Sequence, residues 1–247
     1  MSSDLDFFSR VIYLENVLST NTFLKENDCV DRTLVYTFDQ TQGRGRENRK
    51  WLNFKDKNLA LSVLFRPNKK VLNFLWYIAV NSLALIKLLE EYGVKNSFIK
   101  WPNDIYIEDK KIAGILAESV WIGENVDKVI VGIGVNVNST IDDVNSIDKK
   151  ATSVLIETGN IIDLKDFTEK YISKLGEYFN IFLNEEKVEY IKREWLEKNN
   201  IIGKMVKWIF NGTEIFGTAI GIDGDGFLLL QTNNEVIKIL SGDVVLI

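Results

Sequence analysis

Histidine is absent from this sequence of 247 residues, so no part of its chemistry can use an imidazole. A Ser-His or Cys-His nucleophilic pair, a histidine general base and a histidine-bound metal all require that side chain. Cys29 is the single cysteine, which excludes a disulfide within the chain and a cysteine-rich zinc site. Any reaction must therefore rely on lysine, arginine, carboxylate, amide and backbone groups.

An excess of positive charge and long apolar runs are also missing. The chain has 30 Lys and Arg against 35 Asp and Glu, a net charge of −5, which disfavours a broad nucleic-acid-binding face. Its apolar runs fall well short of the ~20 residues that a membrane span needs. Residues 1–6 lack the basic start and apolar core of a signal peptide. We therefore expect a cytoplasmic protein that binds neither DNA nor membranes.

The apolar periodicity predicts a mixed α+β domain in the first 200 residues. Strands are expected at 10–18, 34–38, 59–65, 105–107, 112–122 and 129–137, helices at 73–92, 164–182 and near 188–195, and a surface loop at 139–150. The charged turn at 108–110 predicts an antiparallel hairpin, which would carry Gly114 back toward Asp104.

The pattern changes at Gly203 to short strands separated by turn residues. Asn211-Gly212 is a strong hairpin signal between 205–210 and 214–222, and two further strands are expected at 227–232 and 235–240. About 45 residues of this kind are typical of a small β-barrel. We therefore predict two domains, residues 1–200 and residues 203–247.

A polar loop from Gly43 to Trp51 carries four cations and one acid within an acidic chain. Glycines let a backbone approach a ligand closely, and guanidinium groups bind phosphate or carboxylate through two hydrogen bonds at once. The loop therefore favours a small polyanion as its ligand. A solvated basic loop without a ligand is the alternative.

Three further segments could contribute polar groups or space for a ligand. Lys100 to Asp104 places a cation, an amide and a carboxylate around Pro102, although an ordinary strand-to-turn junction would look the same. Lys111 opens a strand that contains Gly114, which indicates either a close ligand or an edge lysine that prevents aggregation. Residues 132–136 are better explained as a pocket floor than as a dinucleotide site, because no helix or third glycine follows.

Ser19 and Thr20 precede a short helical stretch. Their hydroxyl groups could bond a ligand, or they could simply cap the helix.

Together these segments resemble the biotin protein ligases (biotin–acetyl-CoA-carboxylase ligases) over nearly the whole chain. The matching residues are Ser19-Thr20-Asn21, Gln40, the GRGR run at 43–46 with Arg49 and Trp51, KWPND at 100–104, KIAGILAE at 111–118 and GIGVNVN at 132–138. The resemblance implies a mixed-sheet catalytic domain related to class II aminoacyl-tRNA synthetases and a C-terminal SH3-like barrel. Because the first strand begins near Arg10, we expect the single-function class without an N-terminal DNA-binding domain.

The resemblance also implies a two-step reaction. Biotin and MgATP would give biotinyl-5′-AMP and pyrophosphate, and the biotinyl group would pass to a lysine of a biotin carboxyl carrier protein. Family members often form homodimers. Lipoate–protein ligase, on the same fold, and a non-catalytic biotin-binding module remain alternatives, although Lys111 and the loop arginines are intact.

The motif match assigns the functional roles known in the family to specific residues of this chain. The catalytic residues would be Lys111, Arg46 and Asp104, the last also being the candidate Mg²⁺ ligand. Biotin contacts would come from Ser19, Thr20, Asn21, Gln40, Gly43, Arg44, Arg46, Lys111, Gly114, Ile115 and Gly134. Contacts with ATP or the adenylate would come from Arg46, Arg49, Trp51, Lys100, Asn103, Lys111 and Asn136. Asn48 stands where family loops commonly have glycine, so we expect altered loop mobility.

Overall fold

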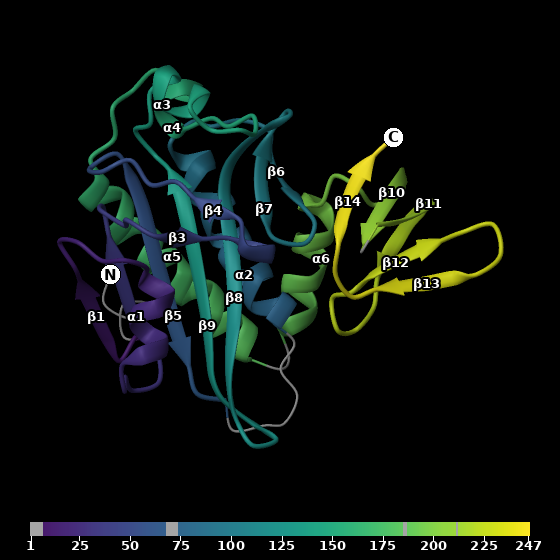
Figure 1. Cartoon of the computed structure of the whole chain (residues 1–247), viewed down its shortest axis with the longest axis horizontal. Coiled ribbons are helices and arrows are strands. Elements are labelled where there is room, and N and C mark those ends of the chain that lie inside the picture. The colour runs from purple at the N-terminus through teal and green to yellow at the C-terminus, as the bar shows by residue number, and fades with distance from the viewer. Residues whose placement is uncertain (1–6, 68–73, 185–186, 211) are drawn as a thin grey trace.

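The computed structural model describes residues 7–67, 74–184, 187–210 and 212–247, without the side chain of Asn48. A seven-stranded mixed sheet with helices forms one part of the molecule and a five-stranded antiparallel sheet forms the other (Figure 1). The strands of the first part are β1 (Arg10–Tyr13), β2 (Thr33–Thr37), β3 (Gly43–Arg44), β4 (Lys50–Trp51), β5 (Asn58–Phe65), β6 (Ser97–Lys100), β7 (Asp104–Ile107), β8 (Lys110–Ile122) and β9 (Asn125–Asn136). Its helices are α1 (Thr20–Glu26), α2 (Phe74–Glu91), α3 (Ile141–Asn145), α4 (Val154–Thr158), α5 (Leu164–Leu183) and α6 (Val188–Lys198), with a 3₁₀ turn η2 (Arg46–Asn48).

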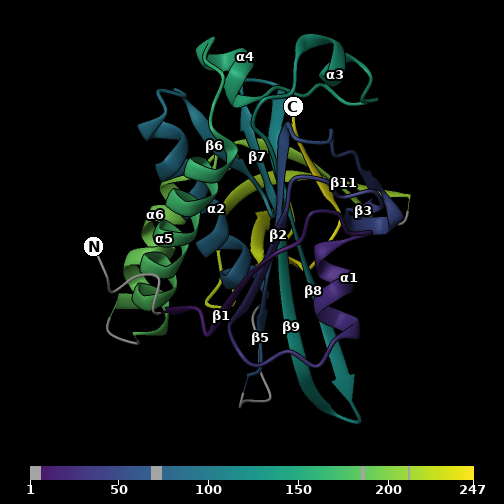
Figure 2. The ribbon, with the colours of Figure 1, turned by 90° about the vertical axis from the view of Figure 1, so that its left-hand side faces the viewer.

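The large sheet has the strand order β1-β2-β5-β9-β8-β7-β6. Strands β1 and β2 are parallel, and the other neighbours are antiparallel. Helices α2, α5 and α6 lie on one side of the sheet and α1 lies on the other (Figure 2). Every residue of β5 is buried, as expected for a strand in the middle of a sheet that is covered on both faces.

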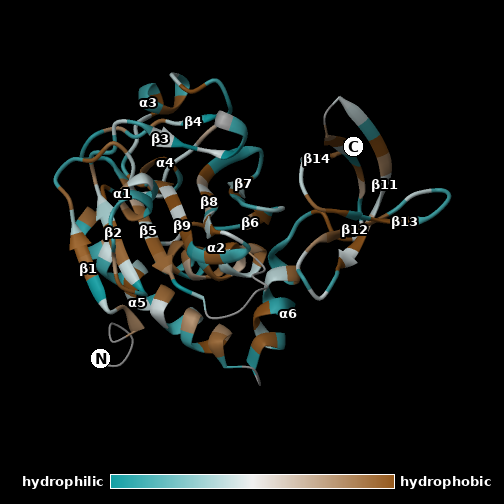
Figure 3. Cartoon of the chain, turned by 60° about the horizontal axis from the view of Figure 1, so that its bottom comes forward, coloured by the Kyte–Doolittle hydropathy of each residue, from teal (hydrophilic) through white to brown (hydrophobic). Residues whose placement is uncertain are grey.

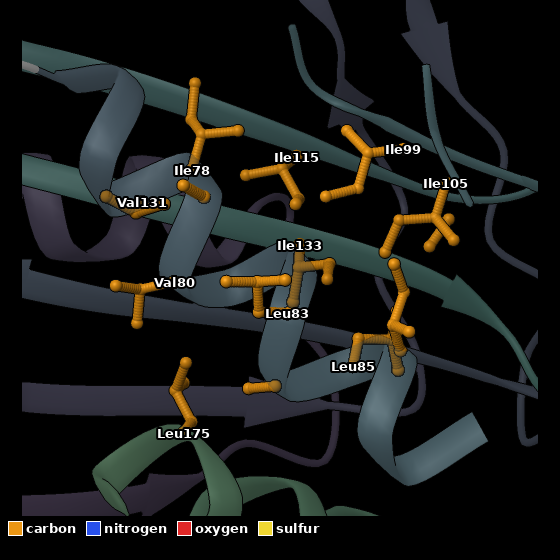
Figure 4. Close-up of a cluster of buried hydrophobic side chains, with 14 of the residues drawn as sticks. Ile78, Val80, Leu83, Leu85, Ile99, Ile105, Ile115, Val131, Ile133 and Leu175 are labelled. Atoms are coloured by element: carbon orange, nitrogen blue, oxygen red, sulfur yellow. The ribbon is translucent and has the colours of Figure 1, made fainter. Parts of the chain in front are cut away.

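The hydrophobic core lies between this sheet and the helices α2 and α5. Val80 and Leu83 of α2 pack near Val131 and Ile133 of β9, and Leu175 of α5 closes the cluster (Figure 4). Each such side chain contributes about 1.5–3 kcal/mol when it is fully buried. Helices α5 and α6 carry both hydrophobic and hydrophilic segments, as expected for helices with one face on the core (Figure 3).

The predicted hairpin is confirmed. Strands β7 and β8 pair antiparallel with Asp104 opposite Gly114, and Glu108 in the turn takes a left-handed backbone conformation (φ 54°). The predicted helices 164–182 and 188–195 are also confirmed, as α5 and α6. Helix α2 agrees with the prediction at 73–92, but its expected first residue, Asn73, lies outside the described residues, as do residues 1–6.

Two expectations need correction. The strand expected over 10–18 ends at Tyr13, and beyond it only Val17 forms an isolated bridge, to Gln40. The loop expected at 139–150 contains the short helix α3. A capping box begins that helix, in which the side chains of Thr140 and Asp143 satisfy each other's backbone N–H groups.

The C-terminal part is an antiparallel sheet with the order β13-β12-β11-β10-β14. Its strands are β10 (Met205–Phe210), β11 (Thr213–Ile222), β12 (Leu228–Gln231), β13 (Val236–Ile239) and β14 (Asp243–Leu246). Gly212 (φ 79°) supplies the left-handed backbone of the predicted β10–β11 turn, and Asn211 lies outside the described residues. The predicted small C-terminal β domain and the α+β class are therefore confirmed, although β14 was not expected.

Candidate functional site

A cavity of about 650 Å³ lies between the large sheet, the start of α1, the loop 43–51 and the start of β14. We call residues 43–51 the arginine loop. Of the residues predicted for the site, all line this cavity except Gly43. Gly43 lies beside it, where a Cβ atom would stand 2.7 Å from the Gln40 Nε2 and 2.5 Å from the Trp51 carbonyl oxygen. The structure therefore brings together motifs that span more than a hundred residues of sequence.

The arginine loop is a small hairpin. Gly43 pairs with Trp51 and Arg44 pairs with Lys50, and the turn η2 between them contains Glu47 with a left-handed backbone (φ 55°). Glu47 is thus the residue of this loop that adopts the left-handed backbone conformation. The Asn48 side chain lies outside the described residues, so its expected effect on mobility remains a prediction.

All three arginines in the loop bind residues outside it. Arg44 forms an ion pair of 3.0 Å with Glu118 on β8. Arg46 donates from Nη1 to the Asn103 Oδ1 (3.0 Å), and Arg49 forms an ion pair of 2.7 Å with Asp243 on β14. The hydrogen bond with Asp243 raises the pKa of Arg49 above its ordinary value.

Lys111 stands beside this loop at the start of β8. Its Nζ donates to the Asp104 Oδ1 at 2.6 Å, and both side chains are about three-quarters buried. The same Nζ lies 5.5 Å from the centre of the Trp51 ring. An ammonium group is thus held at the cavity wall by one carboxylate, where a substrate anion could also reach it.

Trp51 covers the glycine floor of the cavity. A Cβ atom added to Gly134 would overlap the Trp51 indole, and one added to Gly114 would stand 3.2 Å from its Cζ3. The motif match expects these glycines to admit biotin and Trp51 to lie near the adenine. The indole itself occupies the space over the glycines, and its buried Nε1 has no hydrogen-bond partner among the described residues.

Neutral polar groups line the end of the cavity beside α1. The Thr20 backbone N–H donates to the Gln40 Oε1 (2.9 Å), and Asn21 donates from Nδ2 to the Glu118 Oε2 (2.9 Å). Ser19 lines the cavity and also caps α1, because its Oγ accepts from the Thr22 N–H. The capping role and the cavity position therefore coexist in Ser19.

The side chains of four further site residues contact other parts of the protein. Asn103 donates to the Ile115 carbonyl (2.8 Å), Asn136 donates to the Thr152 carbonyl (3.0 Å), and the Lys100 Nζ lies over the Tyr106 ring. The Ile115 side chain points into the hydrophobic core (Figure 4). Ile115 therefore presents mainly its backbone to the cavity.

Sequence reasoning missed four residues that support the site. Glu118 lies in the KIAGILAE motif and binds both Asn21 and Arg44. The Ser62 Oγ lies 2.6 Å from the Asn21 Oδ1. Lys128, buried on β9, donates to the carbonyls of Leu24, Lys25 and Asn27 at the end of α1, and Asp243 binds Arg49. Only Glu118 had a sequence signal, namely its place in a matching motif.

The described residues offer little for a metal on their own. They contain no cluster of three or more Asp, Glu, Cys or His side chains arranged to hold an ion. Asp104 faces the cavity, as expected for the candidate Mg²⁺ ligand, but it is paired with Lys111. Mg²⁺ commonly takes one or two protein carboxylates and completes its shell with phosphate oxygens and water. The site therefore fits a metal that arrives with a nucleotide.

Comparison with known families agrees with this geometry. A model described as the biotin/lipoate A/B protein ligase family matches residues 13–136, and one described as the biotin protein ligase C terminal domain matches residues 201–247. The chain belongs to the biotin/lipoate A/B protein ligase family. The resemblance to biotin protein ligases is thereby confirmed.

Individual relatives point the same way. The biotin protein ligase from Aquifex aeolicus, solved in complex with biotin and ATP, is 33% identical with a TM-score of 0.82, over 97% of this chain and 99% of that chain. The biotin–[acetyl-CoA-carboxylase] ligase of Paracoccus denitrificans is 31% identical over 80% of this chain and 83% of that protein. The bifunctional ligase/repressor BirA of Escherichia coli is 30% identical over 83% of this chain. The match covers 63% of that relative, less than two thirds of its length.

Proposed function

We propose that this chain is a biotin–[acetyl-CoA-carboxylase] ligase, which activates biotin with ATP and transfers it to a lysine of a biotin carboxyl carrier protein. One observation carries the proposal: Lys111, Arg46 and Arg49 line one cavity with Arg44 and with the neutral polar side chains at its end beside α1. The Aquifex aeolicus relative, in complex with biotin and ATP, and the name of the Paracoccus denitrificans relative support it.

The first step joins two anions. A carboxylate oxygen of biotin attacks the α-phosphorus of ATP, and the bond from that phosphorus to its bridging oxygen breaks, so pyrophosphate leaves with the electron pair. Two unit charges 4 Å apart repel by about 1 kcal/mol in water and by about 4 kcal/mol at an effective dielectric constant of 20. Lys111, Arg46 and Arg49 line the cavity and would offset this repulsion. No base is needed, because the nucleophile is already a carboxylate, and this agrees with the absence of histidine.

The second step forms an amide bond. The neutral amine of the acceptor lysine attacks the acyl carbon of biotinyl-5′-AMP, the bond to the phosphate oxygen breaks, and AMP leaves with the electron pair. The acceptor nitrogen must also lose protons. We assign Asp104 as the group that assists this loss, because its carboxylate faces the cavity and accepts a hydrogen bond from Lys111.

The remaining roles are those of the motif match. The biotin contacts would be Ser19, Thr20, Asn21, Gln40, Gly43, Arg44, Gly114, Ile115 and Gly134, and the adenylate contacts would be Trp51, Lys100, Asn103 and Asn136 in addition to Arg46, Arg49 and Lys111. Mg²⁺, bound by the phosphates with Asp104 as the protein ligand, would reduce the negative charge that the approaching carboxylate meets.

Three broader assignments belong to the same proposal. Residues 1–200 would form the catalytic domain and residues 203–247 the SH3-like domain. A homodimer paired through the large sheet is expected from the resemblance, and the exposed Val11 and Tyr13 on the edge strand β1 would suit such a contact. We assign the protein to the cytoplasm. Among the helices described, none is long and apolar enough to cross a membrane.

The decisive experiment uses purified protein, biotin, MgATP and a biotin carboxyl carrier domain. We expect the intact mass of the carrier to rise by one biotinyl group, with pyrophosphate released only when biotin is present. Lipoate in place of biotin tests the other acid named in the family description. Pyrophosphate release with lipoate alone would identify a lipoate ligase, and biotin binding without pyrophosphate release would identify a non-catalytic module.

A further inference from the structure

The C-terminal sheet reaches the candidate site through the first residue of β14. Asp243 lines the cavity, although it lies 194 residues from Arg49 in the sequence. Its carboxylate accepts from the Arg49 Nη2 (2.7 Å) at Oδ2 and from Nη1 (3.5 Å) at Oδ1. The preceding carbonyl, that of Gly242, accepts from the Arg46 Nη2 at 3.4 Å. Two arginines of the loop are therefore tied to one short segment of the second sheet.

Contacts with β10 fix this segment on the side away from the arginine loop. Trp208 donates from Nε1 to the Ser241 carbonyl (2.8 Å), and Asp243 pairs with Ile209 on β10. Gly242 has φ 107°, and a Cβ atom at this position would stand 2.5 Å from the Trp208 Nε1. A side chain would therefore strain the turn and meet the indole. The Asp243 carboxylate thus stands on a fixed strand end.

Arg49, the partner of Asp243 in the arginine loop, has fewer contacts that fix its position. The Arg49 side chain is 44% exposed, and its other ion pair joins it to Glu47 within the same loop. A bond within the loop cannot fix the loop relative to the sheets. Asp243 and the Gly242 carbonyl therefore join this half of the arginine loop to the second sheet, while Asn103 joins it to the first.

We propose that Asp243 is a positioning residue that anchors the arginine loop to the C-terminal sheet and so sets the place of Arg49 at the cavity. The loop then depends on the second sheet for its resting position. The consequence for catalysis rests on the proposed function: a loosened loop would release the adenylate sooner, whereas the anchoring itself needs no substrate.

Limited proteolysis of the full chain by trypsin, without ligands, tests the anchor directly. The arginine loop offers trypsin four basic residues, Arg44, Arg46, Arg49 and Lys50. In Asp243→Asn we expect cleavage within 44–50 to be roughly three- to fivefold faster than in wild type, because cleavage follows the population of the open loop. Asp243→Glu, which keeps the charge, should restore part of the protection.

Glu214→Gln is the matched control, because it removes an ion pair with Lys207 (2.9 Å) from the same sheet but away from the cavity. Its loop should be cleaved at the wild-type rate. Equal cleavage of the loop in wild type, Asp243→Asn and Glu214→Gln would overturn the proposal. A general rise in cleavage of Asp243→Asn at sites throughout the chain would also overturn it, since that indicates global destabilisation.

A second measurement follows the release of biotinyl-5′-AMP from the preloaded protein. We expect severalfold faster release from Asp243→Asn than from wild type or Glu214→Gln. Equal release rates would overturn the catalytic consequence. If wild type forms no adenylate, the proposed function fails, while the ligand-free proteolysis still decides whether Asp243 anchors the loop.

Discussion

The Lys111 Nζ lies 2.6 Å from the Asp104 Oδ1, across the hairpin of β7 and β8. This bond joins two sequence motifs, KWPND and KIAGILAE, at the wall of one cavity. A register shift between Ile105 and Tyr106 brings the two side chains together. The pairing holds the Lys111 side chain in place at the cavity wall, and a fixed side chain is what preorganised charge stabilisation requires.

Replacing Lys111 with alanine should lower biotin-dependent pyrophosphate exchange by at least about 100-fold, because it removes a cation that we propose neutralises the two joined anions. The thermal unfolding midpoint should stay close to that of wild type. Lys110→Ala is the matched control, since Lys110 pairs with Glu157 and does not line the cavity. Normal exchange in Lys111→Ala would remove Lys111 from the mechanism.

Arg46→Gly should loosen the arginine loop by deleting the bonds to Asn103 and to the Gly242 carbonyl. We expect the adenylate to escape about tenfold faster, since hydrogen bonds from a charged donor are among the stronger ones. Escape would be measured as biotin attached to lysines of an added bystander protein. Lys55→Ala, which changes an exposed cation outside the cavity, should leave bystander labelling unchanged. Unchanged selectivity in Arg46→Gly would contradict a retaining role for the loop.

Glu118→Gln tests a residue that the sequence did not single out for the site. The amide oxygen of glutamine can still accept from Asn21, but the ion pair with Arg44 is lost. We expect the KM for biotin to rise roughly three- to tenfold with little change in the KM for ATP. Glu108→Gln, at the exposed turn before β8, provides the control. A change confined to ATP would argue against a role at the biotin end.

Gly134→Ala should disturb the floor of the cavity, because the new methyl group overlaps the Trp51 indole. We expect biotin affinity to fall by about tenfold or more, as overpacking a site costs about 1–3 kcal/mol. The tryptophan emission spectrum should change as the ring is displaced. Gly221→Ala serves for comparison, since a Cβ atom there meets nothing within 4 Å. Wild-type affinity in Gly134→Ala would show that biotin does not lie on this floor.

The anchor at Asp243 should depend on pH. The hydrogen bond from Arg49 is the chief cause that holds the pKa of this carboxyl below its ordinary value of 3.8. A lowered folded-state pKa means that the contribution to stability is complete above 3.8 and is lost as the pH falls through the lowered value. Asp243→Asn should therefore unfold at a lower urea concentration than wild type near pH 7. Its free energy of unfolding should be lower by less than about 1 kcal/mol, because both side chains of the pair are half-exposed. The two proteins should converge near pH 2, and a difference that persists there would contradict the ion-pair explanation.

Sequence patterns predicted the elements whose signals are local. The apolar periodicity identified α2 and α5, and the charged turn at 108–110 identified the β7–β8 hairpin. The patterns overextended β1, because the apolar residues after Tyr13 continue without a neighbouring strand to pair with them. They missed β14, whose four residues depend on pairing with β10.

The site was predicted as a set of residues but not as a set of contacts. The resemblance to the biotin protein ligases indicated Lys111 and the loop arginines, because each matching motif is short and continuous in sequence. The ion pair of Arg49 with Asp243 spans 194 residues, and no local pattern marks either partner for the other. Lys128 was missed for a related reason, since its buried ammonium group binds helix-end carbonyls that only the tertiary fold brings near.

The indole that rests on Gly134 occupies space that the proposed biotin contacts at Gly114 and Gly134 would need. Any molecule that is to lie on this floor must first push Trp51 aside. That exchange loses no hydrogen bond, because the Trp51 Nε1 has none with the described residues, and a buried unpaired donor costs about 1–3 kcal/mol. Displacement of Trp51 would therefore leave its Nε1 free to gain a partner, and the moved ring would report ligand binding as a change in intrinsic fluorescence.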